Sequence, residues 1–255
     1  MRFASLGSGS RGNALVVEAR STRILLDCGF GLCETTSRLG RLGLTPDDLS
    51  AVVVTHEHDD HIGGVARLAR RHSIPVWLTH GTLTGFEALF AGIGNLHVID
   101  NYRSFAVGDL QVEPFPVPHD AREPAQYVFS DGSRRLGVLT DTGCSTRHIE
   151  AMLSGCDALV LECNHDPGML QVSSYPQKLR ERIAGRYGHL DNRTAAELLA
   201  RLDTVHLKHL VAAHLSQENN RPELARAALA EAIGCDPEWV EVADQDNGLG
   251  WRAIS

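Results

Sequence analysis

A dense polar segment follows an apolar run early in the chain, and its side chains are of the types that bind metals. The segment His56-Glu57-His58-Asp59-Asp60-His61 holds three imidazoles and three carboxylates, directly after Ala51-Val52-Val53-Val54-Thr55. Imidazole nitrogens suit zinc, manganese or iron, and a carboxylate among them adds the charge needed to hold a second ion nearby. A solvated polar turn is the alternative, but three histidines and an aspartate at this spacing behind a strand favour a two-metal site.

The neighbouring residues place this polar segment between a strand and a helix. Residues 52–54 are β-branched and apolar, as a strand buried on both faces requires. Ile62, Val65 and Leu68 then recur at helical spacing. We therefore expect the metal-binding segment to lie on a strand-to-helix loop.

Other apolar segments also end on a residue that can bind a metal. They are residues 136–140, followed by Asp141, residues 159–161, followed by Glu162, and residues 210–213, followed by His214. Together with the strand before His56, they would present four such side chains at one edge of a sheet, where packed strand ends hold ligand atoms in position. His119 is a further candidate. Taken singly, His119 or His214 is more often an ordinary histidine than a ligand.

The rest of the chain alternates between strand and helix patterns. Strands are expected near residues 2–6, 14–18, 22–26, 76–79, 97–99, 104–107, 110–117, 126–129, 135–140, 158–161, 209–213 and 239–243. Helices are expected near residues 82–91, 146–153, 175–186, 192–202 and 222–233. This order predicts an α/β sandwich of two mixed sheets, each covered outside by helices. A chain of 255 residues with 43% hydrophobic content suits one domain over residues 1–255.

Composition and charge indicate where the protein acts and which partners it can bind. No apolar stretch is long enough for a signal peptide or a membrane span, so we expect a cytoplasmic protein without a membrane partner. The six cysteines form no Cys-x-x-Cys pair, which is typical of free thiols. The net charge of −8 argues against a broad basic surface for nucleic acid, although two divalent ions would reverse the field of an acidic cleft. The arginine-rich stretches 67–71 and 178–182 fit the solvent-exposed faces of amphipathic helices better than a row of phosphate-binding residues.

Several motifs together resemble one superfamily. The polar segment matches the His-x-His-x-Asp-His signature of the metallo-β-lactamase-fold hydrolases, which implies a four-layer αββα sandwich. Further motifs resemble the bacterial YycJ (WalJ) subgroup over nearly the whole chain. They are Ser5-Leu6-Gly7-Ser8-Gly9-Ser10, Gly12-Asn13, Leu26-Asp27-Cys28-Gly29, Glu162-x-Asn164-His165-Asp166, Gly188-His189-Leu190 and His214-Leu215-Ser216-x-Glu218-Asn219-Asn220. One departure is Asp191, where a small hydroxyl residue is expected.

The resemblance implies two divalent metal ions, which these ligand types allow to be zinc, manganese or iron. One ion would be bound by His56, His58 and His119, the second by Asp60, His61 and His214, and Asp141 would bridge the two. A water or hydroxide shared between the ions would complete the site, an arrangement that favours phosphoryl chemistry.

Other residues are candidates for catalysis and substrate binding. Glu162 and His189 resemble the Glu and His relay of tRNase Z-type phosphodiesterases, which would protonate the departing alkoxide. His165 is a further catalytic candidate, although it could equally well serve only to hydrogen-bond a loop. Asp60 is a candidate both as a catalytic residue and as a metal ligand. The glycine-rich residues 7–13 are read first as a hairpin turn. The substrate-binding candidates are Ser216, Asn219, Arg221 and Arg11.

The function implied is a dinuclear metal-dependent phosphodiesterase, and within the subgroup a 5′-to-3′ exonuclease acting on DNA. Ordinary elements fill the stretch between Asp141 and His214, which argues against the large RNA-clamping insertion of RNase J-like enzymes. A hydrolase of a small or cyclic phosphodiester stays open, and it suits the acidic composition better. A non-catalytic regulatory partner with a structural metal site also stays open, but a proton donor beside the metals argues against it. The sequence does not predict the oligomeric state.

Overall fold

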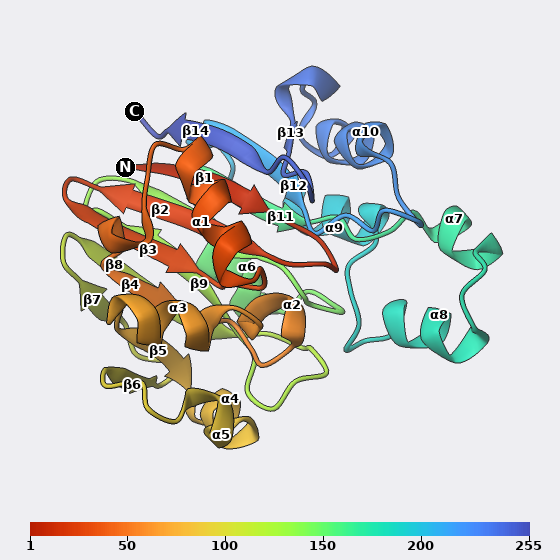
Figure 1. Ribbon diagram of the computed structural model, residues 1–255. Coiled ribbons are helices and arrows are strands. Elements are labelled where there is room, and N and C mark those ends of the chain that lie inside the picture. The colour runs from red at the N-terminus through yellow and green to blue at the C-terminus, as the bar shows by residue number, and fades with distance from the viewer.

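Two seven-stranded mixed sheets pack face to face in the computed structural model, which describes residues 1–255 (Figure 1). The first sheet runs in the order β14 (Leu249–Ala253), β1 (Arg2–Gly7), β2 (Ala14–Ala19), β3 (Thr22–Leu26), β4 (Ala51–Val53), β5 (Val76–Thr79) and β6 (Leu96–Ile99). The second runs β13 (Glu241–Val242), β12 (His209–Ala213), β11 (Ala158–Glu162), β10 (Arg135–Leu139), β9 (Ala125–Ser130), β8 (Leu110–Pro116) and β7 (Phe105–Val107). Strands β3 to β6 are mutually parallel, as are β10 to β13.

Helices cover the outer face of each sheet. Helices α1 (Leu32–Arg41) and α3 (Val65–His72) pack on the first sheet, and α6 (Arg147–Leu153), α9 (Asn192–Leu199) and α10 (Pro222–Ile233) pack on the second. The layers are therefore helix, sheet, sheet and helix, which confirms the predicted αββα sandwich. The shorter helices are α2 (Asp59–Ile62), α4 (His80–Gly85), α5 (Glu87–Phe90), α7 (Pro167–Val172) and α8 (Gln177–Ile183), with 3-10 turns η1 (Pro46–Asp48) and η2 (Pro237–Trp239).

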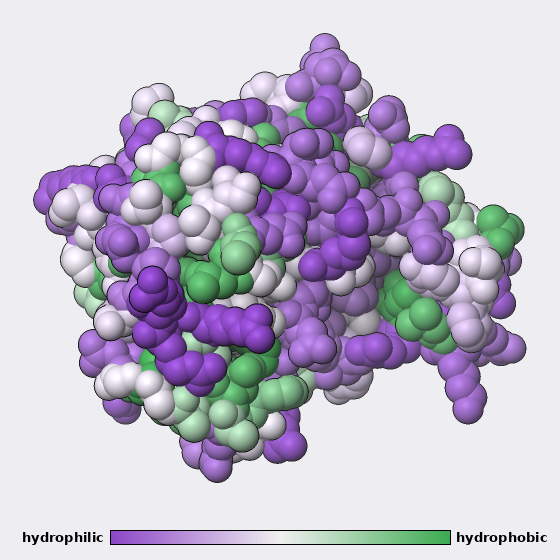
Figure 2. Space-filling view, in the orientation of Figure 1, coloured by the Kyte–Doolittle hydropathy of each residue, from purple (hydrophilic) through white to green (hydrophobic).

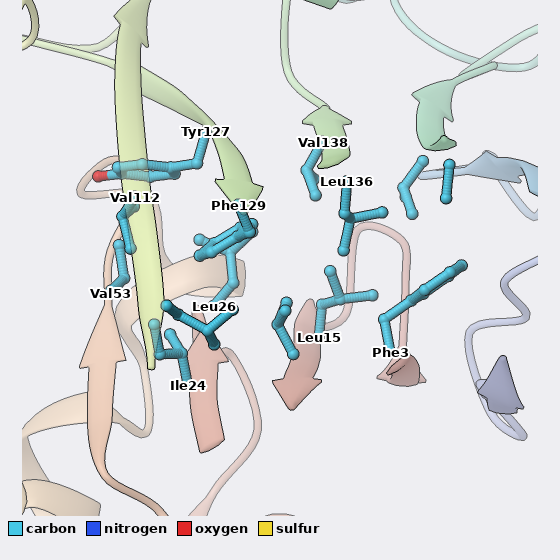
Figure 3. Packing of buried hydrophobic residues seen from close by; sticks show 14 of the residues in the cluster. Phe3, Leu15, Ile24, Leu26, Val53, Val112, Tyr127, Phe129, Leu136 and Val138 are labelled. Atoms are coloured by element: carbon cyan, nitrogen blue, oxygen red, sulfur yellow. The ribbon is translucent and has the colours of Figure 1, made fainter. Parts of the chain in front are cut away.

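The central core fills the space between the two sheets (Figure 3). Because side chains alternate along a strand, Leu15 of β2 points into this core while its neighbour Val16 packs outward beneath the helices. Both faces of the inner strands are thus buried, which explains their continuous apolar runs. Tyr127 places its ring in the central core and donates a hydrogen bond from its hydroxyl to the Val54 carbonyl at 2.6 Å. This bond ties the second sheet to the segment that leads into the metal-binding residues.

The structure departs from the predicted elements in several places. The helix expected over 82–91 is divided into α4 and α5 at Phe86, whose φ of −140° is not helical. The helix expected over 175–186 is shorter, and the strand expected over 239–243 is reduced to the two-residue β13, with η2 ending at Trp239. Helices α1 and α7 and strand β14 were not predicted, because none carries a clear apolar repeat. In α1, for example, Thr35 and Arg38 are buried beside Leu39.

A segment formed by α7 and α8 projects from the body of the molecule (Figure 1). No side chain of α8 is buried. The segment is attached by an ion pair between Arg182 and Asp120 at 2.5 Å and by the Asp120 amide, which donates to the Tyr187 carbonyl at 3.0 Å. Figure 2 shows a largely hydrophilic surface in this view, with small hydrophobic patches on the projecting segment and over the region of α3 to α5. No helix combines the length and the apolar character that a membrane span needs.

Candidate metal centre

The candidate ligands come from the strand ends of both sheets. His56 follows β4 in the first sheet, whereas Asp141, Glu162 and His214 lie at the ends of β10, β11 and β12 in the second. The expectation that all four strands belong to one sheet was therefore wrong. The strand-end pattern shows which residues lie at a sheet edge but not which sheet each strand joins. The two edges meet across the sandwich, and the side chains converge there.

The first group consists of three imidazoles whose nitrogens face one another. The distance from His58 Nδ1 is 3.0 Å to His56 Nε2 and 3.3 Å to His119 Nε2. His119 Nδ1 donates to the Gly188 carbonyl at 3.1 Å, so its Nε2 is left with a lone pair. The Thr55 hydroxyl donates to Asp27 and therefore accepts from His56 Nδ1 at 3.0 Å, which leaves Nε2 of His56 as a lone-pair donor too. Facing lone pairs repel one another unless a cation or a proton lies between them.

The second group combines imidazoles and carboxylates. His61 Nε2 lies 3.4 Å from Asp60 Oδ2 and 3.2 Å from Asp141 Oδ2. His214 Nε2 lies 3.5 Å from Asp60 Oδ2 and 3.5 Å from Asp141 Oδ1. Asp141 also forms a cluster with His56 and His61 in which all ligand atoms lie within 4.8 Å of one another. Asp141 therefore lies between the two groups, and the bridging role that the resemblance implies for it stays a prediction.

Two atoms of this centre test whether the residues fit a metal. Asp141 Oδ2 and His214 Nε2 are buried and make no hydrogen bond. A buried polar atom without a partner costs about 1–3 kcal/mol, and such atoms are rare in folded proteins. Both atoms face the other candidate ligands, where a divalent cation would satisfy them. The nitrogen and oxygen donors and the unsatisfied atoms therefore fit divalent-metal binding.

The electrostatics of the centre keep its carboxylates ionised. Burial alone would raise the pKa of Asp141, but the charges of His214 and His61 outweigh it and hold the pKa well below its usual range. For His214, burial acts to lower the pKa, but the charge of Asp141 and the nearby carboxylates of Asp60 and Glu162 raise it to about 10. Without a metal, protons on the imidazoles thus balance the carboxylates. A bound metal would replace those protons.

Unusual backbone conformations direct several of these side chains toward the centre. Asp27, Asp141 and His214 have φ values of 59°, 52° and 56°, in the left-handed region that residues other than glycine seldom adopt. Each of them lies one or two residues after the end of a strand, β3, β10 or β12. Such strained conformations persist where the surrounding structure enforces them, and they gather at functional sites. Here each sharp turn directs a side chain across the sheet edge into the centre.

Glu162 and His189 form a pair beside the candidate ligands. Glu162 Oε1 lies 2.8 Å from His189 Nδ1 and 3.1 Å from His214 Nδ1, and its Oε2 accepts from the Thr142 and Leu190 amides at 3.0 and 3.1 Å. Burial would raise the pKa of Glu162, but the charge and hydrogen bonds of His189 and His214 lower it to about 2. Because Nδ1 of His189 faces this carboxylate, its Nε2 remains for a ligand. Glu162 itself is fully buried.

Asp27, Thr55 and Asn13 support the centre but were given no role from the sequence. Asp27 Oδ2 accepts from His61 Nδ1 at 2.8 Å, and its Oδ1 accepts from the Thr55 amide at 2.8 Å. Asn13 Nδ2 donates to Asp60 Oδ2 at 3.2 Å. Asp27 follows the apolar strand 22–26, so the strand-end pattern that found Asp141 could have found it. Nothing local marks Asn13, since it lies in the hairpin turn that joins β1 to β2, where a turn was expected.

The remaining predicted site residues lie outside the clusters. His165 is buried, with Nδ1 3.4 Å from Asn164 Oδ1, and belongs to none of the potential ligand groups. Ser216 and Asn219 are buried on the turn after His214, where the Ser216 hydroxyl accepts from the Asn219 amide at 3.1 Å. Arg11 forms an exposed ion pair with Asp246 at 2.6 Å, and Arg221 is exposed before α10.

Comparison with known proteins assigns the chain to a family. Residues 22–215 match the model of the β-lactamase superfamily domain. The chain belongs to this superfamily and is an enzyme of the hydrolase class. Exodeoxyribonuclease YycJ of Bacillus anthracis is 36% identical over 91% of this chain and 89% of its own length. Exodeoxyribonuclease WalJ of Streptococcus pneumoniae serotype 2 (strain D39) is 32% identical over 98% of this chain and 91% of its own. Within the superfamily, the chain belongs with the YycJ/WalJ proteins.

A solved structure supports the fold. The metallo-β-lactamase fold protein YhfI from Bacillus subtilis superposes with a TM-score of 0.76 over 99% of both chains, at 15% identity. At this identity the similarity concerns the fold alone. Together with the family match, it confirms the resemblance inferred from the motifs.

Proposed function

We propose that the chain is a dinuclear metal-dependent phosphodiesterase that degrades DNA as a 5′-to-3′ exonuclease. The observation that carries the proposal is the buried Glu162, which holds His189 against a cluster of metal-binding side chains. A lactamase-type reaction needs only a polarised carbonyl, whereas phosphodiester cleavage gains from an acid that protonates the leaving oxygen. The names of the YycJ and WalJ relatives as exodeoxyribonucleases support DNA as the substrate.

The residues described above would hold two ions. His56, His58 and His119 would hold one, Asp60, His61 and His214 the other, and Asp141 would contact both. Bound zinc or manganese would supply Lewis acidity and a hydroxide nucleophile at neutral pH. The donor set is equally compatible with iron.

The chain's own groups supply the rest of the chemistry. As an acid, His189 would act in its doubly protonated form, giving the Nε2 proton to the departing oxygen while its Nδ1–H stays hydrogen-bonded to Glu162. Glu162 is a positioning residue, since it is fully buried and reaches the substrate only through His189. It orients the ring through the hydrogen bond to Nδ1, as a buried carboxylate does for other catalytic histidines. His165 lies in the same motif, and we retain it as a secondary positioning candidate.

Substrate phosphates beyond the centre would be held by exposed side chains. Arg221 has no ion-pair partner, so it is free to contact a phosphate, whereas Arg11 must first leave Asp246. Ser216 and Asn219 are buried, so they would contribute indirectly, by fixing the conformation of the turn after His214. Arg221→Ala should therefore weaken DNA binding more than Arg11→Ala.

An assay on several substrates tests the proposal. Metal-loaded protein is given end-labelled single-stranded DNA, duplex DNA, RNA, a cyclic dinucleotide and bis-p-nitrophenyl phosphate. We expect DNA to be shortened from its 5′ end. His189→Ala should slow DNA cleavage by about 10²–10⁴-fold but affect bis-p-nitrophenyl phosphate far less, because nitrophenolate leaves without a proton.

Two outcomes would contradict the proposal. Equal losses on both substrates would remove His189 from the acid role. Efficient turnover of the cyclic dinucleotide without DNA cleavage would replace the exonuclease by a hydrolase of small phosphodiesters.

A further inference from the structure

An aromatic cleft lies next to the metal centre and takes no part in the chemistry proposed above. Its volume is about 470 Å³, and its walls include Tyr102, Pro118, His148, Arg186 and Tyr187. Tyr102 comes from the turn between β6 and β7, His148 from α6, and Tyr187 from the loop between α8 and α9. Three segments that are distant in sequence therefore build one cleft, which we call the tyrosine cleft.

The tyrosine cleft adjoins residues of the centre through the chain itself. Pro118 precedes the ligand candidate His119, and Tyr187 lies two residues before His189. Hydrogen bonds hold these two strips of chain together: the Asp120 amide donates to the Tyr187 carbonyl at 3.0 Å, and His119 Nδ1 donates to the Gly188 carbonyl at 3.1 Å. Two residues of chain span at most about 7 Å. A nucleotide bound at the centre would reach the tyrosine cleft with its base or with that of its neighbour.

The side chains of the tyrosine cleft are exposed aromatics. Tyr102 is 76% exposed and Tyr187 59% exposed, whereas tyrosine is ordinarily of intermediate burial. The His148 ring lies with its centroid 6.0 Å from that of Tyr102. Neither tyrosine hydroxyl makes a hydrogen bond within the protein, so packing and hydrogen bonding leave both rings available. Exposed aromatic rings are the groups on which unpaired nucleobases stack.

A cation accompanies these rings. Arg186 is exposed and forms no ion pair, whereas Arg182 on the same segment is paired with Asp120. An unpaired guanidinium beside aromatic rings can contact a phosphate or stack on a base. In a chain with a net charge of −8, a free cation at this place favours a phosphate-bearing ligand.

We propose that the tyrosine cleft is a base-stacking subsite that holds an unpaired nucleotide of the DNA strand whose phosphate lies at the centre. This inference rests on the proposed nuclease function and adds the form of its substrate. Stacking needs an unpaired base, so the enzyme would act on single-stranded ends and would require a duplex end to open. Because every base has a π-face, the subsite would tolerate any sequence.

Substitutions in the tyrosine cleft test this subsite. We expect Tyr187→Ala and Tyr102→Ala each to raise KM on single-stranded DNA by about tenfold to a hundredfold, as loss of a base stack does elsewhere. Tyr187→Phe keeps the ring and should retain most of the affinity. The loss on DNA should exceed the loss on bis-p-nitrophenyl phosphate at least tenfold. Trp239→Ala, which removes an exposed aromatic from η2, is the matched control and should behave as wild type on both substrates.

A modified substrate provides a second test of the stacking subsite. An oligonucleotide that lacks the base at one of its first three 5′ positions should be cleaved more slowly by the wild type, by a factor similar to that of Tyr187→Ala. The variant itself should be insensitive to the missing base. DNA cleavage that responds to neither change would overturn the stacking subsite alone. Hydrolysis of bis-p-nitrophenyl phosphate with no DNA cleavage at all would overturn the nuclease function, and this inference with it.

Discussion

Buried carboxylates organise the imidazoles of the metal centre. Asp27 accepts from His61, and Glu162 contacts both His189 and His214. A hydrogen bond to one ring nitrogen decides which nitrogen keeps the lone pair, and it also fixes the orientation of the ring. Asp27 and Glu162 therefore determine where the imidazole lone pairs point.

A substitution of Asp27 tests whether these supporting carboxylates affect metal binding. Asp27→Asn preserves the size of the side chain, and asparagine tolerates the positive φ found there, but the negative charge facing His61 is lost. We expect metal affinity and activity to fall by about 10–100-fold while the fold is retained. Metal titration monitored by calorimetry, with circular dichroism as the control for folding, measures both. An Asn variant with unchanged metal affinity would show that Asp27 serves only to bind Thr55.

The charged histidines predict how metal binding depends on pH. The pKa of His214 is raised to about 10 and that of His61 is also raised, because nearby carboxylates outweigh the effect of burial. Both rings then carry protons at neutral pH, and a metal must displace them. Metal affinity should rise with pH until it approaches the pKa of His214, by about tenfold per pH unit for each proton released. Calorimetry in buffers of different ionisation enthalpy counts the protons, and binding without proton release would contradict the model.

The candidate ligands stand out in the sequence by type and spacing, whereas the hydrogen bonds of their supporting residues do not. Three histidines and Asp60 share one short segment, so their types and spacing reveal the site. Asp27 and Asn13 act through hydrogen bonds to residues that are distant in sequence, and nothing in their own neighbourhoods indicates those partners. For Ser216 and Asn219, the sequence shows proximity to His214 but not that both side chains are buried.

At the scale of elements, helix α9 begins at the one position that departs from the YycJ-like pattern. Asp191 accepts from the Thr194 amide at 2.8 Å and so caps α9. Aspartate and small hydroxyl residues perform this task almost equally well, because each offers a side-chain oxygen to the first turn. The departure therefore preserves the local structure that a hydroxyl residue would provide.

If Asp191 acts only as a helix cap, serine should replace it with little loss of stability and alanine with a larger loss. Asp191→Ser should change the free energy of unfolding by less than about 0.5 kcal/mol, whereas Asp191→Ala should lower it by about 0.5–2 kcal/mol through loss of the cap. Urea denaturation of the three proteins makes the comparison. If the Ser variant lost as much stability as the Ala variant, the carboxylate charge rather than capping would explain Asp191.

The predicted elements succeeded where periodicity is strong. The inner strands are apolar on both faces, and α9 and α10 carry regular apolar positions, so their existence followed from the sequence. The division between α4 and α5 depends on the conformation of Phe86, which has no strong local signal. Strand β14 has one buried residue, Leu249, and a glycine at its second position, so only its pairing with β1 makes it a strand.

At the scale of the whole molecule, the centre joins the two sheets. His56 and its neighbours belong to the first sheet, and Asp141 and His214 to the second, while one hydrophobic cluster fills the space between them. We infer that residues 1–255 unfold as one unit, because no boundary divides this cluster. A bound metal would add a link between segments far apart in the chain.

Metal removal should therefore reduce stability. Anything that binds only the folded state stabilises it, by about 4 kcal/mol when free metal exceeds its Kd a thousandfold. We expect a single unfolding transition in calorimetry and a lower Tm after chelation. The Asp141→Ala variant should show little response of Tm to metal or chelator. Two separate transitions would indicate that the sheets unfold independently.

The pairing of β14 with β1 bears on the order in which the protein is made. Residues 2–7 emerge from the ribosome long before residues 249–253, their outer neighbour in the sheet (Figure 1). Until then the backbone amides and carbonyls along that side of β1 lack their partners, and an unpaired strand edge can pair with another chain. The polar segment 56–61 is synthesised before residues 249–253, which complete the sheet that carries it. A nascent chain that still lacks residues 249–253 is therefore open to mispairing along β1.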